Sequence, residues 1–223
     1  MLAPAAVRRS PSDYGRVSET TLDMETFAPA AVDTDVNSRV IKSLVSPRPI
    51  AWVSTVSPDG VDNLAPFSAY NYVSSSHPLL MVSTGVREDD DGDEELKDTA
   101  RNAVDTGEFA VNVVTEDVAE AMDRTAAALE PEESEFDAFD LERAPCREIA
   151  APRVADAIAT MECSLFETMR VKDRLVLFGE VECVHLADEL LTDGEIDATT
   201  FETVGRLGGP YYTVGEHADL ERR

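Results

Sequence analysis

The sequence is poor in the residues that typify nucleic-acid-binding and membrane proteins. Lys and Arg account for only 19 of its 223 residues, against 45 Asp and Glu, so the formal net charge is −26. Such a chain has no basic surface with which to displace counterions from a phosphate backbone, and anionic lipid repels it. No apolar run approaches the roughly 18–20 residues needed to cross a bilayer. We therefore expect a soluble protein that binds neither nucleic acid nor membrane.

Lysine is especially scarce, because Lys42, Lys97 and Lys172 are the only lysines in the chain. Dense carboxylates with few lysines suit a cytoplasm of high salt, where screening removes self-repulsion and hydrated carboxylates keep the chain in solution. We expect a halophilic source, with an ordinary acidic protein as the alternative. The first 24 residues contain three arginines but no apolar segment typical of a secretory signal, so the expected location is cytoplasmic.

Familiar catalytic and metal-binding signatures are also absent. The sequence has no P-loop, no H-E-x-x-H, no G-x-S-x-G and no G-x-G-x-x-G after an expected strand. Cys146, Cys163 and Cys183 are odd in number and lack C-x-x-C spacing, which favours buried thiols over disulfides or a metal site. The acidic run 88–95 does not fit a calcium loop, because its first ligand position would be Arg87. We expect no metal and no catalytic side chain.

The order of hydrophobic runs predicts a mainly β chain with short peripheral helices, of class α+β. Residues 1–37 show no sustained period and are expected to be a flexible tail, with Met24 as a candidate start, before one domain over 38–223. Runs at 49–57 and 61–67 flank a Ser-Pro-Asp-Gly turn and predict a hairpin, whose second strand contains Pro66 and must bulge or lie at an edge. Further strands are expected at 78–84 and 108–114, a second hairpin at 160–171 and 175–186, helices at 98–106 (capped by Asp98) and 117–129, and acidic loops at 88–95 and 130–140. Several hairpins favour a barrel.

Polar groups gather on the first hairpin and at one helix start. Arg48-Pro49 precedes the first strand, and Asn63, Ser68 and Asn71 lie on or after the second. Lys97-Asp98-Thr99 begins a predicted helix, where free N–H groups and the helix dipole favour an anion. The alternative is that Lys97 only neutralises the acidic run before it.

These segments resemble the flavin reductase-like, FMN-binding split-barrel family. The resemblance covers about Ser38 to Tyr212, and its blocks occur in the expected order: Arg48-Pro-Ile-Ala-Trp-Val-Ser-Thr55, Asp59-Gly60, Asn63-Leu-Ala-Pro-Phe-Ser68, Asn71, Lys97-Asp-Thr99 with Asn102, Thr106-Gly-Glu-Phe-Ala-Val-Asn112 and Gly205-Arg-Leu-Gly-Gly209. It implies a split β-barrel, a homodimer, and FMN (with FAD possible) held noncovalently near the subunit interface.

A flavin needs a flat slot, backbone groups for its pyrimidine edge and an anion site for its phosphate. From the resemblance, we expect Trp52, Val53 and Pro66 to form the walls of the slot. The alternative for Trp52 is that its side chain is simply part of the hydrophobic core. Backbone groups around Ser54, Asn63 and Ala65 are expected at the ring edge, and Ser68, Lys97 and Thr99 at the phosphate. Arg48 and, after it, Arg206 are candidates for phosphate or nicotinamide contacts, although an arginine is more often a surface ion pair.

The implied activity is hydride transfer from NADH or NADPH to flavin, followed by onward electron transfer. A second possibility is a flavin-binding electron carrier that serves a redox partner protein without nicotinamide oxidation. A third is a barrel used only for protein interaction, which would carry no flavin. The acidic run 87–95 is expected to weaken FMN binding at low salt. The acidic run 130–140 is expected to repel a phosphorylated nicotinamide nucleotide.

Overall fold

The computed structural model describes residue 23 and residues 25–88, 94–197 and 199–213. The chain divides into two units, Met1–Ser38 and Arg39–Arg223. Most of the expected N-terminal tail therefore lies outside the described residues. In its described part, a 3-10 helix η2 (Pro29–Ala31) is followed by α1 (Thr34–Leu44), whose Asn37 Nδ2 donates to Pro29 O at 2.8 Å. The sequence had given no expectation of α1.

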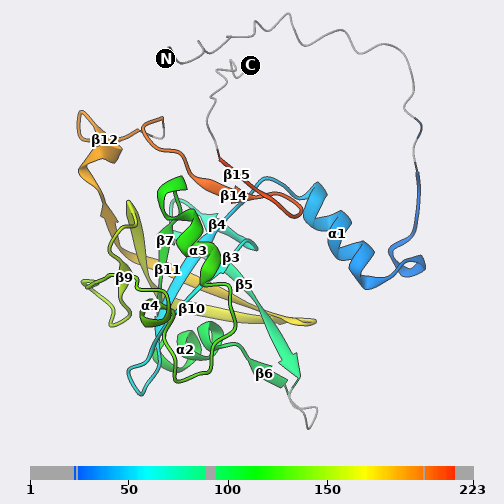
Figure 1. Cartoon of the computed structure of the whole chain (residues 1–223), viewed down its shortest axis with the longest axis horizontal. Helices are drawn as coiled ribbons and strands as arrows, with labels where there is room; N and C mark the ends of the chain where they lie inside the picture. The colour runs from blue at the N-terminus through cyan, green and yellow to red at the C-terminus, as the bar shows by residue number, and fades with distance from the viewer. Residues whose placement is uncertain (1–22, 24, 89–93, 198, 214–223) are drawn as a thin grey trace, which may run out of the picture. The chain divides into compact units, whose positions relative to one another are not determined.

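The larger unit is built on an antiparallel sheet with strand order β3-β2-β7-β10-β11-β5-β4, and β6 pairs with β5 (Figure 1). Its strands are β2 (Ala51–Val56), β3 (Asp62–Phe67), β4 (Tyr70–Ser74), β5 (Leu79–Glu88), β6 (Glu94–Leu96), β7 (Glu108–Val113), β10 (Ala159–Val171) and β11 (Arg174–Leu186). The two expected hairpins are β2–β3 and β10–β11. Pro66 lies on β3, which ends the strand order, so the edge position expected for it is confirmed.

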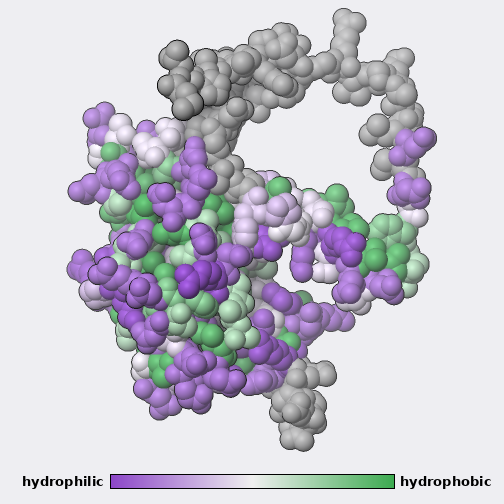
Figure 2. All heavy atoms as spheres, viewed as in Figure 1, coloured by the Kyte–Doolittle hydropathy of each residue, from purple (hydrophilic) through white to green (hydrophobic). Residues whose placement is uncertain are grey.

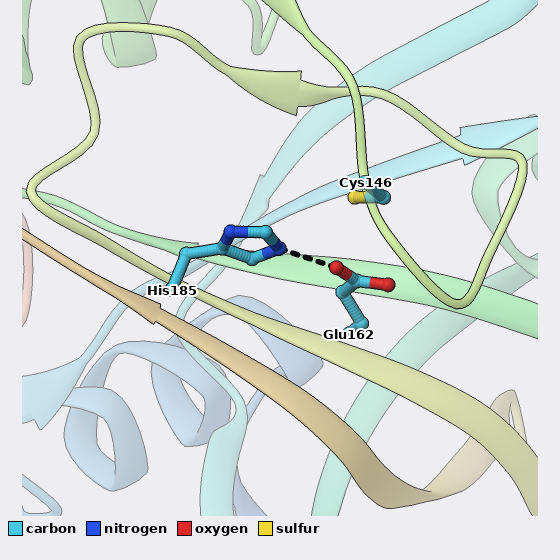
Figure 3. A group of neighbouring side chains, drawn as sticks. All are labelled: Cys146, Glu162 and His185. Atoms are coloured by element: carbon cyan, nitrogen blue, oxygen red, sulfur yellow. Dashed lines mark hydrogen bonds and ion pairs between the residues drawn. The ribbon is translucent and has the colours of Figure 1, made fainter.

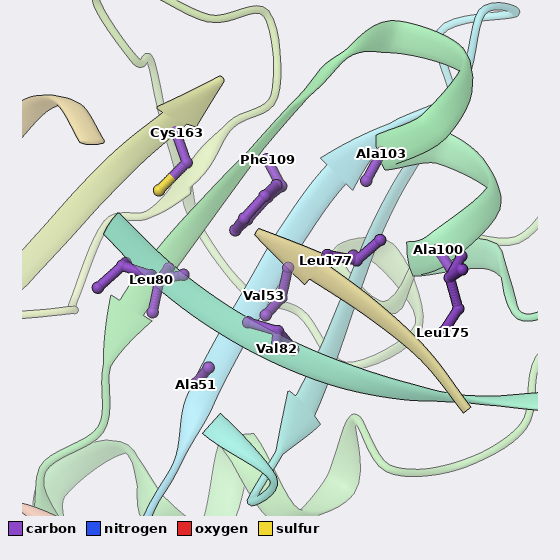
Figure 4. Packing of buried hydrophobic residues seen from close by; sticks show 11 residues of the cluster. Ala51, Val53, Leu80, Val82, Ala100, Ala103, Phe109, Cys163, Leu175 and Leu177 are labelled. Carbon is purple, nitrogen blue, oxygen red and sulfur yellow. The ribbon is translucent and has the colours of Figure 1, made fainter. Parts of the chain in front are cut away.

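The sheet curls into a barrel, because strands far apart in its order share one core. Val53 of β2 and Val82 of β5 are fully buried in the same cluster, although three strands separate β2 from β5. Phe109 of β7 and Leu177 of β11 complete the interior between them (Figure 4). A flat sheet could not bring these faces together. The α+β split-barrel fold expected from the sequence is confirmed.

Short elements surround the barrel. They are α2 (Asp98–Thr106), η3 (Glu116–Val118), α3 (Ala119–Arg124), α4 (Glu135–Ala138), η4 (Asp188–Leu190), and the strand pairs β8 (Arg143–Ala144) with β9 (Arg153–Val154) and β12 (Leu191–Thr192) with β13 (Glu195–Ile196). A separate sheet joins β1 (Arg48–Pro49), β14 (Val204–Arg206) and β15 (Tyr211–Thr213). None of the helices in the described part of the chain has the length and apolar character needed to span a membrane.

Several local expectations need correction. The N-cap of α2 is Lys97 and not Asp98, and no side chain caps this end, although Gly107 ends the helix in the left-handed region as expected (φ 76°). The helix expected at 117–129 is only α3 with the 3-10 turn before it, and α4 interrupts the loop expected at 130–140. The ends of the acidic run expected as a loop at 88–95 belong to strands, because Glu88 at the end of β5 pairs with Glu94 at the start of β6. Residues 89–93 lie outside the described part of the chain.

Candidate functional site

Three cations, Arg87, Lys97 and Arg174, gather beside β5 and are called the cationic group below. A Cβ built on Gly85 would lie 3.3 Å from Arg174 Nη1 and 3.5 Å from Lys97 Cε, so these two side chains meet over the glycine. Burial, followed by the charges of Arg87 and Arg174, lowers the pKa of Lys97, while Asp98 opposes the shift. Lys97 therefore lies in a locally positive environment.

Arg174 is held in place by β5 itself. Its Nε donates to Ser83 Oγ at 3.1 Å and its Nη2 donates to Ser83 O at 2.6 Å. The backbone N–H of Ser83 in turn donates to Ala69 O at 2.9 Å. These contacts link the cationic group to the turn formed by Ser68 and Ala69, between β3 and β4.

Among the residues that the structure describes, the cationic group has no ion-paired carboxylate, although the charge of Asp98 acts on Lys97. No carboxylate there forms an ion pair with Arg87, Lys97 or Arg174, whereas Arg101 and Arg143 each pair with two. In a chain of net charge −26, three adjacent cations with no ion-paired carboxylate among the described residues are candidates for binding an anion. Lys97 was expected at an anion site from the sequence, whereas Arg87 and Arg174 were not, because only the strand register brings them to Lys97.

Thr99 and Asn63 belong to an interior network. Thr99 Oγ1 donates to Asn63 Oδ1 at 2.7 Å, and Asn63 Nδ2 donates to both carboxylate oxygens of Glu135 at 3.0 and 2.9 Å. Glu135, which is 5% exposed, also accepts from Leu64 N at 2.8 Å. Burial raises the pKa of Glu135, and these hydrogen bonds oppose the rise. The hydroxyl of Thr99 and the amide of Asn63 thus have partners within the fold, which differs from the expected phosphate and ring-edge contacts.

The expected slot walls Trp52 and Val53 are core residues. Both are 0% exposed, in clusters on opposite faces of β2, and Trp52 Nε1 donates to Thr125 Oγ1 at 2.9 Å. A side chain with no exposed surface does not wall an open slot, so the core alternative for Trp52 is correct. Ser54 is also 0% exposed, and its backbone lies between β3 and β7, opposite Leu64 and Ala110. Its backbone therefore faces neighbouring strands on both sides, and the expected ring contact stays a prediction.

Arg48 and Arg206 have structural partners. Arg48 Nη1 donates to the carbonyl of Lys42, in the last turn of α1, and to the carbonyl of Val45, just after the helix. Its Nη2 donates to Leu207 O at 2.9 Å. Arg206 lies opposite Arg48 in the β1–β14 register and stacks over the Tyr211 ring, with its Cζ 4.2 Å from the centroid. Arg48 thus ties residues 42–45 to the loop after β14, and its phosphate or nicotinamide contact stays a prediction.

The other predicted residues are dispersed. Ala65 and Pro66 are half-buried on β3 opposite Val53 and Trp52, Pro49 is exposed on β1, and Asn71 is exposed on β4, where its Oδ1 accepts from Tyr72 N at 2.9 Å. Asp98 accepts from Arg101 Nη1 at 2.7 Å. The structure thus links Lys97 to the backbone next to Ser68 only through Arg174, Ser83 and Ala69, and it shows no contact of Asn71, Pro49 or Arg206 with the cationic group among the described residues.

Asp98 lines a separate acidic cleft of about 300 Å³. This cleft lies between the β2–β3 turn, the outer face of α2 and the segment before α4, and its carboxylate-bearing residues are Asp59, Asp62, Asp98, Asp105, Glu130, Glu132, Glu133 and Glu135. Arg101 is the one basic residue of its lining. Because like charges repel, the cleft is unsuited to a phosphate.

Comparisons with known proteins decide the family. The sequence matches the family model of the flavin reductase like domain over residues 44–200. The chain belongs to this family. A relative, an uncharacterized protein of Aquifex aeolicus, is 39% identical over 83% of this chain and 93% of its own.

Solved structures agree with this assignment. Nitrilotriacetate monooxygenase component B from Bacillus cereus is similar with a TM-score of 0.83 and 33% identity, over 90% of this flavin reductase-like chain and 100% of that one. The 2-nitrobenzoate 2-nitroreductase of Pseudomonas fluorescens matches with a TM-score of 0.80 and 29% identity, over 89% and 96% of the two chains. The resemblance found in the sequence is thereby confirmed, and the chain is a flavin-binding oxidoreductase by family.

Proposed function

We propose that this flavin reductase-like protein binds FMN and oxidises a nicotinamide nucleotide, passing the electrons to a further acceptor. The observation that carries the choice of FMN is the cationic group beside the Ser68–Ala69 turn. A phosphate monoester is a dianion at neutral pH, and Arg87, Lys97 and Arg174 offer it several N–H donors without first breaking an ion pair among the described residues.

The roles of the chain's residues follow from this placement. Arg174 is fixed by Ser83 and would give an oriented contact to the phosphate, while Lys97, which is exposed, would give a mobile one. The Ser68 hydroxyl and the backbone of its turn would add neutral donors. When bound, flavin supplies the redox chemistry itself by accepting a hydride and releasing electrons. The protein therefore needs no nucleophile, and its task is to bind and orient.

The homodimer expected from the family has support from exposed apolar side chains. Phe166 and Met169 on β10 are 64% and 52% exposed, and Tyr72 on β4 is 67% exposed. Large apolar groups on a chain this acidic are costly in water, and a second copy would cover them. On the face shown in Figure 2, apolar areas lie between strongly hydrophilic ones. Light scattering at high salt should give twice the monomer mass, and Phe166→Glu should lower that mass if β10 is at the interface.

The activity is tested by mixing the FMN-loaded protein anaerobically with NADH or NADPH at high salt. Rapid loss of flavin absorbance at about 450 nm supports the reductase. If neither donor bleaches the flavin but a reduced redox protein does, the proposal fails and the chain is an electron carrier. Failure to bind any flavin would contradict both. The acidic segment 130–140 favours NADH, because it repels the extra phosphate of NADPH.

A further inference from the structure

Three side chains from separate segments converge away from the cationic group. Cys146 lies in the segment between β8 and β9, Glu162 on β10 and His185 on β11 (Figure 3). One thiol sulfur, one carboxylate oxygen and one ring nitrogen from these residues all lie within 4.8 Å of one another. We propose that Cys146, Glu162 and His185 form a binding site for Zn²⁺.

The geometry is close to that of a tetrahedral zinc site. With Zn–S near 2.3 Å and Zn–N and Zn–O near 2.1 Å, ligand atoms are separated by about 3.4–3.8 Å. To reach that separation, Glu162 Oε1 and His185 Nε2, which are in hydrogen-bond contact, would move apart, and the Cys146 sulfur would approach both from within 4.8 Å. Glu162 and His185 are already in contact through Oε1 and Nε2, so the metal would replace the hydrogen between them.

The carboxylate is oriented in advance. Glu162 is 0% exposed, and its Oε1 accepts from Arg147 N at 2.8 Å while its Oε2 accepts from Glu148 N at 2.7 Å and Ile149 N at 3.2 Å. Although burial raises its pKa, these amides and His185 together hold the pKa of Glu162 below its ordinary value. Such outer contacts fix a metal ligand in one orientation and keep it ionised. They also place the Cys146 segment against the carboxylate, since the three amides directly follow Cys146 in the chain.

Charge balance selects a divalent, thiophilic ion. Zn²⁺ with one thiolate, one carboxylate and one neutral imidazole has zero net charge, which suits a partly buried site. Binding would release the Cys146 thiol proton to water, and His185 Nε2 would coordinate the metal as an unprotonated nitrogen.

A fourth coordination position is also available. Cys183 lies opposite Glu162 in the β10–β11 register, and its charge acts on Cys146. A water molecule would complete the tetrahedron, because the Cys183 sulfur is not among the ligand atoms that lie within 4.8 Å of one another. The site would fasten the 145–152 segment to the β10–β11 hairpin, independently of flavin binding.

Cobalt titration of the metal-free, untagged, reduced protein tests the proposal. Co²⁺ should bind one per chain and give the near-ultraviolet charge-transfer absorption of a thiolate ligand, which the surface carboxylates cannot produce. Cys146→Ser should abolish this absorption and weaken Zn²⁺ binding, measured by competition with a chelator, by at least tenfold. Cys163→Ser is the matched control and should retain both, because Cys163 lies in the barrel core.

A second measurement needs no variant. Stoichiometric Zn²⁺ should slow alkylation of Cys146, followed by peptide mass spectrometry, by at least tenfold, and a chelator should restore the rate. Absence of the charge-transfer absorption, or equal alkylation rates with and without Zn²⁺, would overturn the site. Neither readout involves flavin, so failure here is distinguishable from failure of the proposed oxidoreductase function.

Discussion

Removing the charge of Lys97 should weaken binding of FMN but not of riboflavin, which lacks the phosphate. Lys97 meets Arg174 over Gly85 and has no ion-paired carboxylate among the described residues, so Lys97→Ala breaks no ion pair in the free protein. A charge-assisted hydrogen bond contributes about 1.5–3 kcal/mol, which corresponds to about 10- to 150-fold in Kd. Because Lys97 is exposed, we expect the lower part of this range.

Flavin fluorescence titrations at fixed high salt provide the assay, with FMN and riboflavin measured on the same preparations. Lys42→Ala is the matched control, since it also removes one of the three lysines but lies on α1. Arg174→Gln should also weaken FMN binding selectively, and by more than Lys97→Ala, because Ser83 holds Arg174 in place. An equal loss for FMN and riboflavin, or no loss in either variant, would refute the phosphate assignment.

Other consequences of the packing can be measured by chemical denaturation. Gly179→Ala would push a methyl group against Phe109, whose Cε1 lies 2.8 Å from the new Cβ, and should lower the free energy of unfolding by about 1–3 kcal/mol. The control Gly209→Ala has open space around the new methyl group and should lower it little. Equal effects of the two variants would contradict the packing. Thr125→Val should cost about 1–3 kcal/mol by leaving the buried indole N–H of Trp52 without its acceptor, and a neutral result would deny that hydrogen bond. Because the pKa of Glu135 is raised, the folded state holds its proton more tightly than the unfolded chain does. Wild type should therefore gain stability relative to Glu135→Gln as the pH falls from neutral towards the ordinary pKa of 4.5, and a relative loss over that range would contradict the raised pKa.

The barrel was predictable because its main hairpins carry strong local signals. The Ser57–Gly60 turn and the long β-rich runs on either side of residues 172–173 fix neighbouring strands through short loops. The helix α1 was missed although Val36, Val40, Ile41 and Leu44 recur at helical spacing. None of the residues of α1 is buried, so no core contact depends on that spacing, and the surrounding polar residues obscured it.

The candidate site was predictable only in part, because the motifs do not reveal which way each side chain points. Trp52 and Val53 alternate on β2, and both faces of that strand are covered, so neither points to an open slot. Lys97 was conspicuous as a rare lysine, but Arg174 lies 77 positions away in the chain and reaches Ser83 only through the β5–β11 register. Pairings of this kind depend on tertiary structure and leave no local pattern.

The short sheet of β1 and β14 has a consequence for the order of assembly. In this sheet Arg48 lies opposite Arg206, and the guanidinium of Arg48 also donates to Leu207 O. The first strand of the larger unit, β1, therefore pairs with β14, which is near the C-terminal end of the chain. During synthesis, β1 must wait without its partner until residue 207 has left the ribosome, whereas the β2–β3 and β10–β11 hairpins can close as soon as each emerges. Contacts of such large sequence separation form slowly. Nascent chains that stop short of β14 should therefore expose the edge of β1 to chaperones.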